Sequence, residues 1–170
     1  MTITLRAKLV LLGTHSAGKT CFFNGDKADY VPTVSVTTSV KHFSLPSNSS
    51  FIFEFLVLDT PGNKIFSRMI EPLVENPCFT LLFCDVSSRE SIDKCKSLLA
   101  TLPDHCTSFV LVTKTSTNHI LERELNKWIK DHDLTSFRIS EGTPQEFTNV
   151  MNSVFSAVAT SLVSIYTECT

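Results

Sequence analysis

The sequence predicts an α/β fold: a doubly wound, mostly parallel six-stranded sheet with one antiparallel hairpin strand and about five helices. Short apolar runs alternate with helical patterns along most of the chain, which favours parallel strands joined by helical crossovers. Two strand patterns near the N-terminus are separated only by a turn-rich segment, and a glycine-rich loop follows the first apolar run. For a chain of 170 residues we expect one domain, over residues 1–170.

The N-terminal part carries the predicted hairpin. Residues 7–13 (AKLVLLG) are almost continuously apolar, as in a strand that is buried on both faces. Residues 35–45 and 51–59 have strand patterns and flank the turn residues PSNSS. We therefore expect these two segments to pair as a hairpin.

Strand and helix patterns alternate through the rest of the chain. One of the helices has a capping serine and apolar residues that recur on one face: Ser88, then Ile92, Cys95, Leu98, Leu99 and Leu102. The expected strands cover residues 79–85, 108–114 and 136–139. Four helices are expected after the hairpin. Two of them cover residues 64–75 and 119–132, and the other two start at Ser88 and Pro144.

Residues 13–20 (GTHSAGKT) fit the phosphate-loop pattern G-x-x-x-x-G-K-[ST], with a predicted strand before them and a helix after. In this pattern backbone N–H groups cradle a polyphosphate, the lysine reaches the β- and γ-phosphates, and the hydroxyl ligates Mg²⁺. We therefore expect Lys19 on phosphate and Thr20 on the metal. The other loop residues expected to contact the nucleotide are Gly13, His15, Ser16, Ala17, Gly18 and Cys21.

Composition argues against several classes of function. The chain has 15 basic and 17 acidic residues without a basic cluster, so we expect no nucleic-acid partner. Its six cysteines form no C-x-x-C pair, and Cys84 lies in an apolar run, so we expect reduced thiols and a cytoplasmic protein. No run reaches the roughly 18 uninterrupted apolar residues of a membrane span, and Arg6 and Lys8 interrupt the N-terminus where a signal peptide is apolar.

A second motif ends the strand pattern at residues 56–62 (LVLDTPG). It puts Asp59 where a carboxylate can hold Mg²⁺ through water and Gly62 where an N–H can meet a γ-phosphate. With both motifs the chain resembles the Ras superfamily of small GTPases, most strongly over residues 5–20 and 56–90. The resemblance implies a P-loop NTPase of Ras-like fold that binds GTP or GDP with Mg²⁺.

Residues 30–36 (YVPTVSV) are similar to the first switch of Rab proteins, which implies that Thr33 closes over Mg²⁺. Thr33 follows Lys19 more closely than is usual in the family, so the first helix has room for about one and a half turns. Thr37 stands at a more usual distance and is the rival ligand, although it falls inside a predicted strand. A third alternative is that neither threonine ligates the metal.

The segments that read the base depart from the family pattern. The family reads guanine with N-K-x-D, whereas residues 113–116 are TKTS, which keeps Lys114 and puts Ser116 in place of the aspartate. Losing a hydrogen bond to a charged group is worth on the order of 1.5–3 kcal/mol, so we expect weak guanine selectivity. The family's S-A-K loop becomes SEG, which implies base contacts from Ser140 and Glu141. Glu141 as a plain loop acid is the alternative.

We expect slow hydrolysis, with Gly62 and Asn63 as the catalytic residues. Asn63 replaces the family's water-orienting glutamine and is one methylene shorter. A displacement of this size can cost about a hundredfold in rate. His15 stands at a loop position that is often smaller in the family, where it crowds the space of an arginine finger. Its alternatives are a general base or a solvent-facing loop histidine.

The C-terminal segment favours a protein partner. Residues 147–167 contain no charged residue, and their apolar side chains spread over more than one helical face, as in a helix buried on more than one side. The alternative is one wide core face with small neutral residues outside it. Cys169 fits neither prenylation pattern, so we expect no prenyl membrane anchor.

Residues 66–99 resemble the corresponding segment of the Rab-like GTPase subunit of the intraflagellar transport B complex. This resemblance implies a protein-transport role in a cilium or flagellum, with a small β-sandwich subunit and a coiled-coil pair as partners. Three functions stay open. They are a weakly hydrolysing, nucleotide-binding subunit of such a transport complex, a divergent Rab that regulates vesicle trafficking, and a non-hydrolysing scaffold or adaptor.

Overall fold

The structure, a computed structural model, describes residues 2–25, 33–62, 71–73, 78–115 and 118–168. Its strands are β1 (Ile3–Gly13), β2 (Thr37–Leu45), β3 (Asn48–Asp59), β4 (Cys78–Asp85), β5 (Thr107–Thr113) and β6 (Thr135–Ile139). Its helices are α1 (Lys19–Asn24), α2 (Arg89–Thr101), α3 (His119–Asp131) and α4 (Pro144–Glu168), with one 3-10 turn, η2 (Glu71–Leu73).

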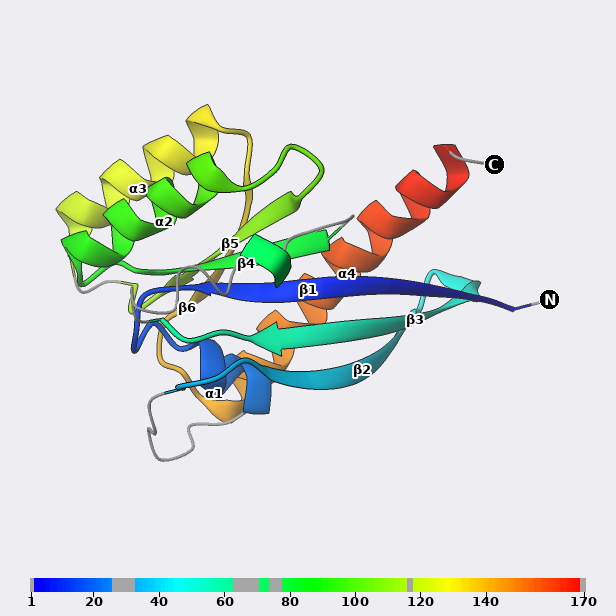
Figure 1. Cartoon of the computed structure of the whole chain (residues 1–170). Coiled ribbons are helices and arrows are strands. Elements are labelled where there is room, and N and C mark those ends of the chain that lie inside the picture. Colours follow the sequence, from blue (N-terminus) through cyan, green and yellow to red (C-terminus); the bar gives the residue numbers. More distant parts are fainter. Residues whose placement is uncertain (1, 26–32, 63–70, 74–77, 116–117, 169–170) are drawn as a thin grey trace.

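The strands form one six-stranded sheet in the order β2-β3-β1-β4-β5-β6. Only the β2–β3 pair is antiparallel, and the other four pairs are parallel. Helices α2 and α3 lie on one face of the sheet, and α1 and α4 lie on the other (Figure 1). The predicted doubly wound fold is thus confirmed, and the carboxyl ends of five strands meet at one edge, where such sheets bind their ligands.

Four α-helices lie in the described part of the chain, against the prediction of about five. The fifth was expected at residues 64–75, and most of that segment lies outside the described residues, which include only 71–73 of it. Helix α1 has six residues, in agreement with the short helix expected between Lys19 and Thr33. Gly25 ends it with a φ of 79°, a backbone conformation that favours glycine.

Two strand boundaries differ from the prediction. Strand β1 starts at Ile3 rather than residue 7, because Ile3 to Leu11 pair along β3 from Phe51 to Asp59. The hairpin turn is shorter than PSNSS, since Leu45 and Asn48 already face each other. Asn48 looked like a turn residue, but its side-chain oxygen accepts a hydrogen bond from the Ser50 N–H at 3.2 Å within the start of β3.

The apolar core forms one layer on each face of the sheet. Beneath α1 and α4, aromatic rings from the sheet pack on the helix, and the rings of Phe55 and Phe155 lie 5.3 Å apart between centroids. Beneath α2 and α3, the layer contains the fully buried Val10, Ile92 and Leu125. Because both layers hold β1 between them, the loop that follows β1 starts from a rigid support.

Helix α4 covers the sheet with only part of its surface. Its buried residues are Phe147, Val154, Phe155, Val158 and Ala159. The apolar residues Val150, Met151 and Leu162 of the same helix are only half-buried, and Ile165 is 41% exposed. Helix α4 is long and apolar enough to cross a membrane, by length and composition alone. Core helices of soluble proteins can have the same length and composition, and 22% of the most apolar window of α4 is buried.

Candidate functional site

The phosphate loop connects the end of β1 to the start of α1 and is held tightly against β4. A Cβ on Gly13, where φ is 148°, would lie 2.7 Å from the Phe83 carbonyl oxygen, so only glycine fits there. Gly18 has a φ of 96° and Ser16 a φ of 59°. The loop thus takes the sharp turns that a backbone cradle for an anion requires.

Lys19 is buried at the centre of this loop, with 5% of its surface exposed. Its Nζ donates to the carbonyl oxygens of Gly13 at 3.2 Å and Thr14 at 2.7 Å. Burial lowers the pKa of Lys19 to about 8, although the negative charge of Asp59 opposes that shift. A buried ammonium held mainly by neutral carbonyls is suited to an anionic ligand, because the anion's charge would offset the desolvation.

Three oxygen-bearing side chains converge beside Lys19. Thr20 Oγ1 donates to Asp59 Oδ2 at 2.7 Å, and Thr33 Oγ1 lies 2.9 Å from Thr20 Oγ1 and 3.4 Å from Asp59 Oδ2. Burial raises the pKa of Asp59, and the hydrogen bond from Thr20 and the positive charge of Lys19 offset only part of that rise. These hydroxyl and carboxylate oxygens are ligands that Mg²⁺ prefers, so the donor set fits the expected metal.

Asp59 carries a second indication of a cation. The residue is 1% exposed, and its Oδ1 is buried without a hydrogen-bond partner among the described residues. A buried carboxylate oxygen that accepts nothing is costly, and a metal ion or its bound water would satisfy it. The rival ligand Thr37 is instead the first residue of β2, exposed to solvent and opposite Asp59 in the strand register.

The expected γ-phosphate contact Gly62 lies directly against the phosphate loop. A Cβ on Gly62 would lie 2.2 Å from the backbone nitrogen of His15. On the loop itself, His15 Nδ1 lies 3.0 Å from Ser16 Oγ. The expected catalytic residue Asn63 lies outside the described residues.

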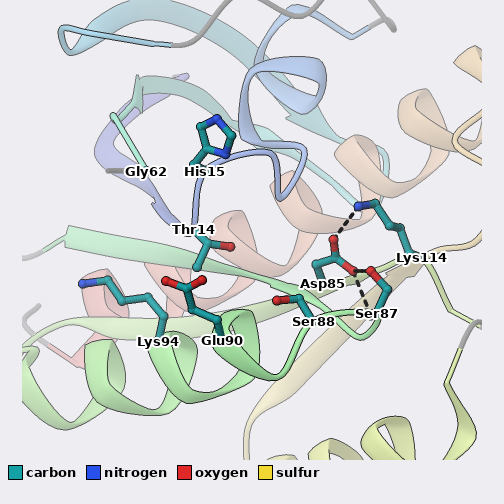
Figure 2. Close-up of a pocket in the computed structure, with 9 residues that line it drawn as sticks. All are labelled: Thr14, His15, Gly62, Asp85, Ser87, Ser88, Glu90, Lys94 and Lys114. Atoms are coloured by element: carbon teal, nitrogen blue, oxygen red, sulfur yellow. Dashed lines mark hydrogen bonds and ion pairs between the residues drawn. The ribbon is translucent and has the colours of Figure 1, made fainter. Parts of the chain in front are cut away.

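A cavity of about 500 Å³ opens between the phosphate loop and the start of α2. Thr14, His15 and Gly62 line one side, and Glu90 and Lys94 of α2 line the other (Figure 2). The end of β4 and the residues after it complete the wall with Asp85, Ser87 and Ser88, together with Lys114. The cavity is lined mainly by polar side chains and adjoins the residues expected to hold phosphate.

Lys114, the residue expected beside the base, is held by a carboxylate. Its Nζ lies 2.5 Å from Asp85 Oδ2 (Figure 2). Burial alone would raise the pKa of Asp85, but hydrogen bonds from Lys114 and Ser87 outweigh burial and lower it. Next to Lys114, Thr113 Oγ1 donates to the Ala17 carbonyl at 3.4 Å and joins the end of β5 to the phosphate loop. Ser116 lies outside the described residues.

The loop after β6 is fixed by a residue that sequence reasoning missed. The backbone N–H groups of Ser140, Glu141 and Gly142 donate to the Glu146 carboxylate at 2.7, 3.0 and 2.7 Å. The bond from the Ser140 N–H, together with those from Gly142 and Glu141, holds the pKa of Glu146 below its usual range. The spacing T-x-x-E at residues 143–146 could have indicated it, because this is the pattern of a helix capping box.

The structure therefore gathers most of the expected site at one edge of the sheet. The phosphate-loop residues, Thr33, Asp59 and Gly62 lie together, and Lys114 follows at the end of β5. Ser140 joins them through its Oγ, which lies 2.6 Å from Thr115 Oγ1. Cys21 is half-buried within α1, and its carbonyl accepts the hydrogen bond from Gly25 that ends this helix.

Comparison with known proteins gives one family and a small group of relatives. A model of the Ras family matches residues 8–162. The human protein named intraflagellar transport protein 27 homolog is 31% identical over 104 residues, which cover 57% of this chain and 55% of that protein. Intraflagellar transport protein 27 of Chlamydomonas reinhardtii is 30% identical over 104 residues, or 57% of this chain and 50% of that protein. The chain thus spans about half the length of the curated relatives it matches.

Proposed function

The chain belongs to the Ras family, and from that premise we propose that it is a Rab-like small GTPase that binds GTP and GDP with Mg²⁺. The observation that carries the proposal is the buried Oδ1 of Asp59, which has no hydrogen-bond partner among the described residues and lies beside the hydroxyls of Thr20 and Thr33. In this assignment the hydroxyls of Thr20 and Thr33 ligate the ion, and the carboxylate of Asp59 binds the ion or its bound water. A Mg²⁺ ion held by these residues would neutralise part of the charge of the nucleotide's phosphates.

In the same assignment the loop that ends β1 holds the phosphates. Lys19 releases the Gly13 and Thr14 carbonyls and donates to the phosphate oxygens instead. The loop backbone from His15 to Cys21 supplies further N–H donors. The buried position of Lys19 supports this role, because a buried ammonium binds an anion with less competition from water.

We assign slow hydrolysis to the site. Gly62 donates its N–H to the γ-phosphate and Asn63 orients the attacking water, less well than a glutamine with its extra methylene. His15 reduces the space for an activating side chain from another protein, since it lines the cavity beside Gly62. On the base side, Lys114, Ser116, Ser140 and Glu141 contact the nucleotide with weak guanine selectivity.

The names of the relatives support a role in intraflagellar transport. We assign the protein to the cytoplasm and to a cilium or flagellum. Its proposed partners are a small β-sandwich subunit and a coiled-coil pair of the transport complex. The half-buried apolar side chains of α4, which include Leu162 and Val163, are the proposed interface.

A titration of the purified protein with fluorescent GTP, GDP and ATP, each with and without Mg²⁺, tests the nucleotide site. We expect Mg²⁺-dependent binding of GTP and GDP. Lys19→Ala removes the phosphate contact and should abolish that binding, whereas Lys127→Ala, an exposed lysine on α3, should leave it unchanged. If Lys19→Ala binds like the unchanged protein, the site assignment is wrong.

The alternative function is a non-hydrolysing scaffold. The wide, partly uncovered surface of α4 favours it, because a scaffold needs an interface and no nucleotide. Co-purification with the transport partners separates the two functions. A scaffold would keep its partners after Lys19→Ala, while a nucleotide-dependent subunit would lose at least one of them.

A further inference from the structure

Three backbone donors of the loop after β6 are taken up by a single side chain of the same chain. The N–H groups of Ser140, Glu141 and Gly142 all donate to the two carboxylate oxygens of Glu146, at 2.7 to 3.0 Å. Thr143 adds a separate bond, in which its Oγ1 accepts from the Glu146 N–H at 3.2 Å. The Glu146 carboxylate thus ties the loop at residues 140–142 to the start of α4.

This loop lies beside the proposed nucleotide site. Thr113 Oγ1 joins the end of β5 to the phosphate loop at the Ala17 carbonyl, and Thr115 Oγ1 lies 2.6 Å from Ser140 Oγ at the end of β6. Ligands of a doubly wound sheet lie outside the carboxyl ends of its strands. In the proposed function residues 113–116 and 140–142 contact the base, so a nucleotide with its phosphates on residues 13–20 would have its base beside this loop.

The edge of the base decides what this loop can recognise. Guanine presents the O6 acceptor at the position where adenine presents the N6 amino donor. A backbone N–H that pointed at this position would therefore favour guanine. The N–H groups of residues 140–142 point instead at Glu146, and the ammonium of Lys114 on the neighbouring loop is paired with Asp85.

We propose that Glu146 is a specificity-determining residue: by holding the three N–H groups of residues 140–142, it removes the donors that would distinguish GTP from ATP. The proposal rests on the proposed nucleotide site and adds its base specificity. Glu146 is a positioning residue in this role, because it acts through the loop backbone. The site then accepts both purine nucleotides with similar affinity.

The experiment compares the ratio of GTP to ATP affinity in four proteins. These are the unchanged chain, Glu146→Ala, Glu146→Gln and Thr143→Ala. Glu146→Ala frees the three N–H groups, and one new hydrogen bond to guanine O6 should raise the ratio about two- to tenfold. Glu146→Gln keeps an acceptor oxygen, so its ratio should lie between those of the alanine variant and the unchanged protein.

Thr143→Ala is the matched control, because it weakens the same helix start and leaves the Glu146 carboxylate on the three N–H groups. Its ratio should equal that of the unchanged protein. Thermal unfolding of all four proteins shows whether each variant is folded, and the glutamine variant serves if the alanine variant is not. The amide NMR signals of residues 140–142 should shift together as Glu146 titrates below the usual pKa range of a glutamate.

The outcomes separate the two proposals. This inference is supported if the unchanged protein binds nucleotide and the ratio of GTP to ATP affinity rises only in the two Glu146 variants. Binding with a ratio that already strongly favours GTP, or one that does not change in the Glu146 variants, overturns the role of Glu146 and leaves the nucleotide site standing. No binding of either nucleotide by the unchanged protein overturns the proposed function and this inference with it.

Discussion

Thr20 Oγ1 donates a hydrogen bond to Asp59 Oδ2 at 2.7 Å, although the two residues are 39 positions apart in the sequence. The parallel pairing of β1 with β3, which sets Leu11 opposite Asp59, brings them together. Thr20 follows β1 through the phosphate loop, whereas Asp59 ends β3. The contact joins the two motifs that carry the proposed metal site.

Asp59→Asn tests that site. We expect the Mg²⁺-dependent part of the GTP affinity to fall about ten- to a hundredfold, because a charged contact is lost, while affinity without Mg²⁺ stays the same. The buried carboxylate is also unfavourable in the protein without ligand, so the variant should unfold at a higher temperature. Asp93→Asn, on the exposed surface of α2, is the control and should change neither quantity.

Thr33→Ala and Thr37→Ala separate the two candidate ligands. Thr33 Oγ1 lies 2.9 Å from Thr20 Oγ1, whereas Thr37 is exposed at the start of β2. Thr33→Ala should lower Mg²⁺-dependent GTP affinity about tenfold, and Thr37→Ala should not. The opposite result would assign the metal to Thr37, and no effect of either variant would mean that neither threonine is a ligand.

The pKa of Lys19 predicts how stability changes with pH. The folded protein lowers this pKa from its usual 10.5 to about 8, so between these two pH values the unfolded chain binds more protons than the folded one. The free energy of unfolding should therefore rise with pH over this window, by at most about 3 kcal/mol. Chemical denaturation from pH 7 to 10.5 measures it. Lys19→Met should remove the rise, and an equal rise in that variant would assign it to another group.

Nucleotide affinity should change in the opposite direction. A bound polyphosphate favours the charged ammonium of Lys19, so GTP affinity should fall as the pH rises above about 8. Titrations at pH 7 and pH 9.5 test this effect. Equal affinities at the two pH values would mean that Lys19 does not contact the phosphates.

Ser116→Asp tests base recognition. An aspartate would restore a charge-assisted contact to guanine, and we expect GTP selectivity over ATP to rise tenfold or more. Ser116→Asn, which lacks the charge, should give a smaller gain. If the aspartate variant shows no gain, the base lies away from residues 113–116.

Much of the fold followed from local patterns. The strands from β3 to β6 and the helices from α2 to α4 appeared close to the expected residues, because alternating apolar runs and the Ser88 cap are local signals. The start of β1 was missed because its first residues are covered only through pairing with β3. The hairpin turn was misplaced because Asn48 and its neighbours resemble a turn when the pairing partner is unknown.

The site was predicted where a motif fixes its residues. The phosphate loop and Asp59 belong to two spaced patterns, and the structure brings both to one edge of the sheet. The Lys114–Asp85 ion pair was not predicted, since nothing local tells which of the chain's acidic residues meets Lys114. The role of Glu146 was missed although the T-x-x-E spacing marks it as a capping residue, whereas which N–H groups it holds depends on the shape of the loop at residues 140–142.

Gly62 leaves less than the width of a methyl group between its Cα and the backbone of His15. An occupant of that space, even one as small as a single oxygen atom, has to displace one of the two backbones. The spacing between the two backbones is therefore a limit on size, because an atom fits between Gly62 and His15 only if one of the two backbones moves away.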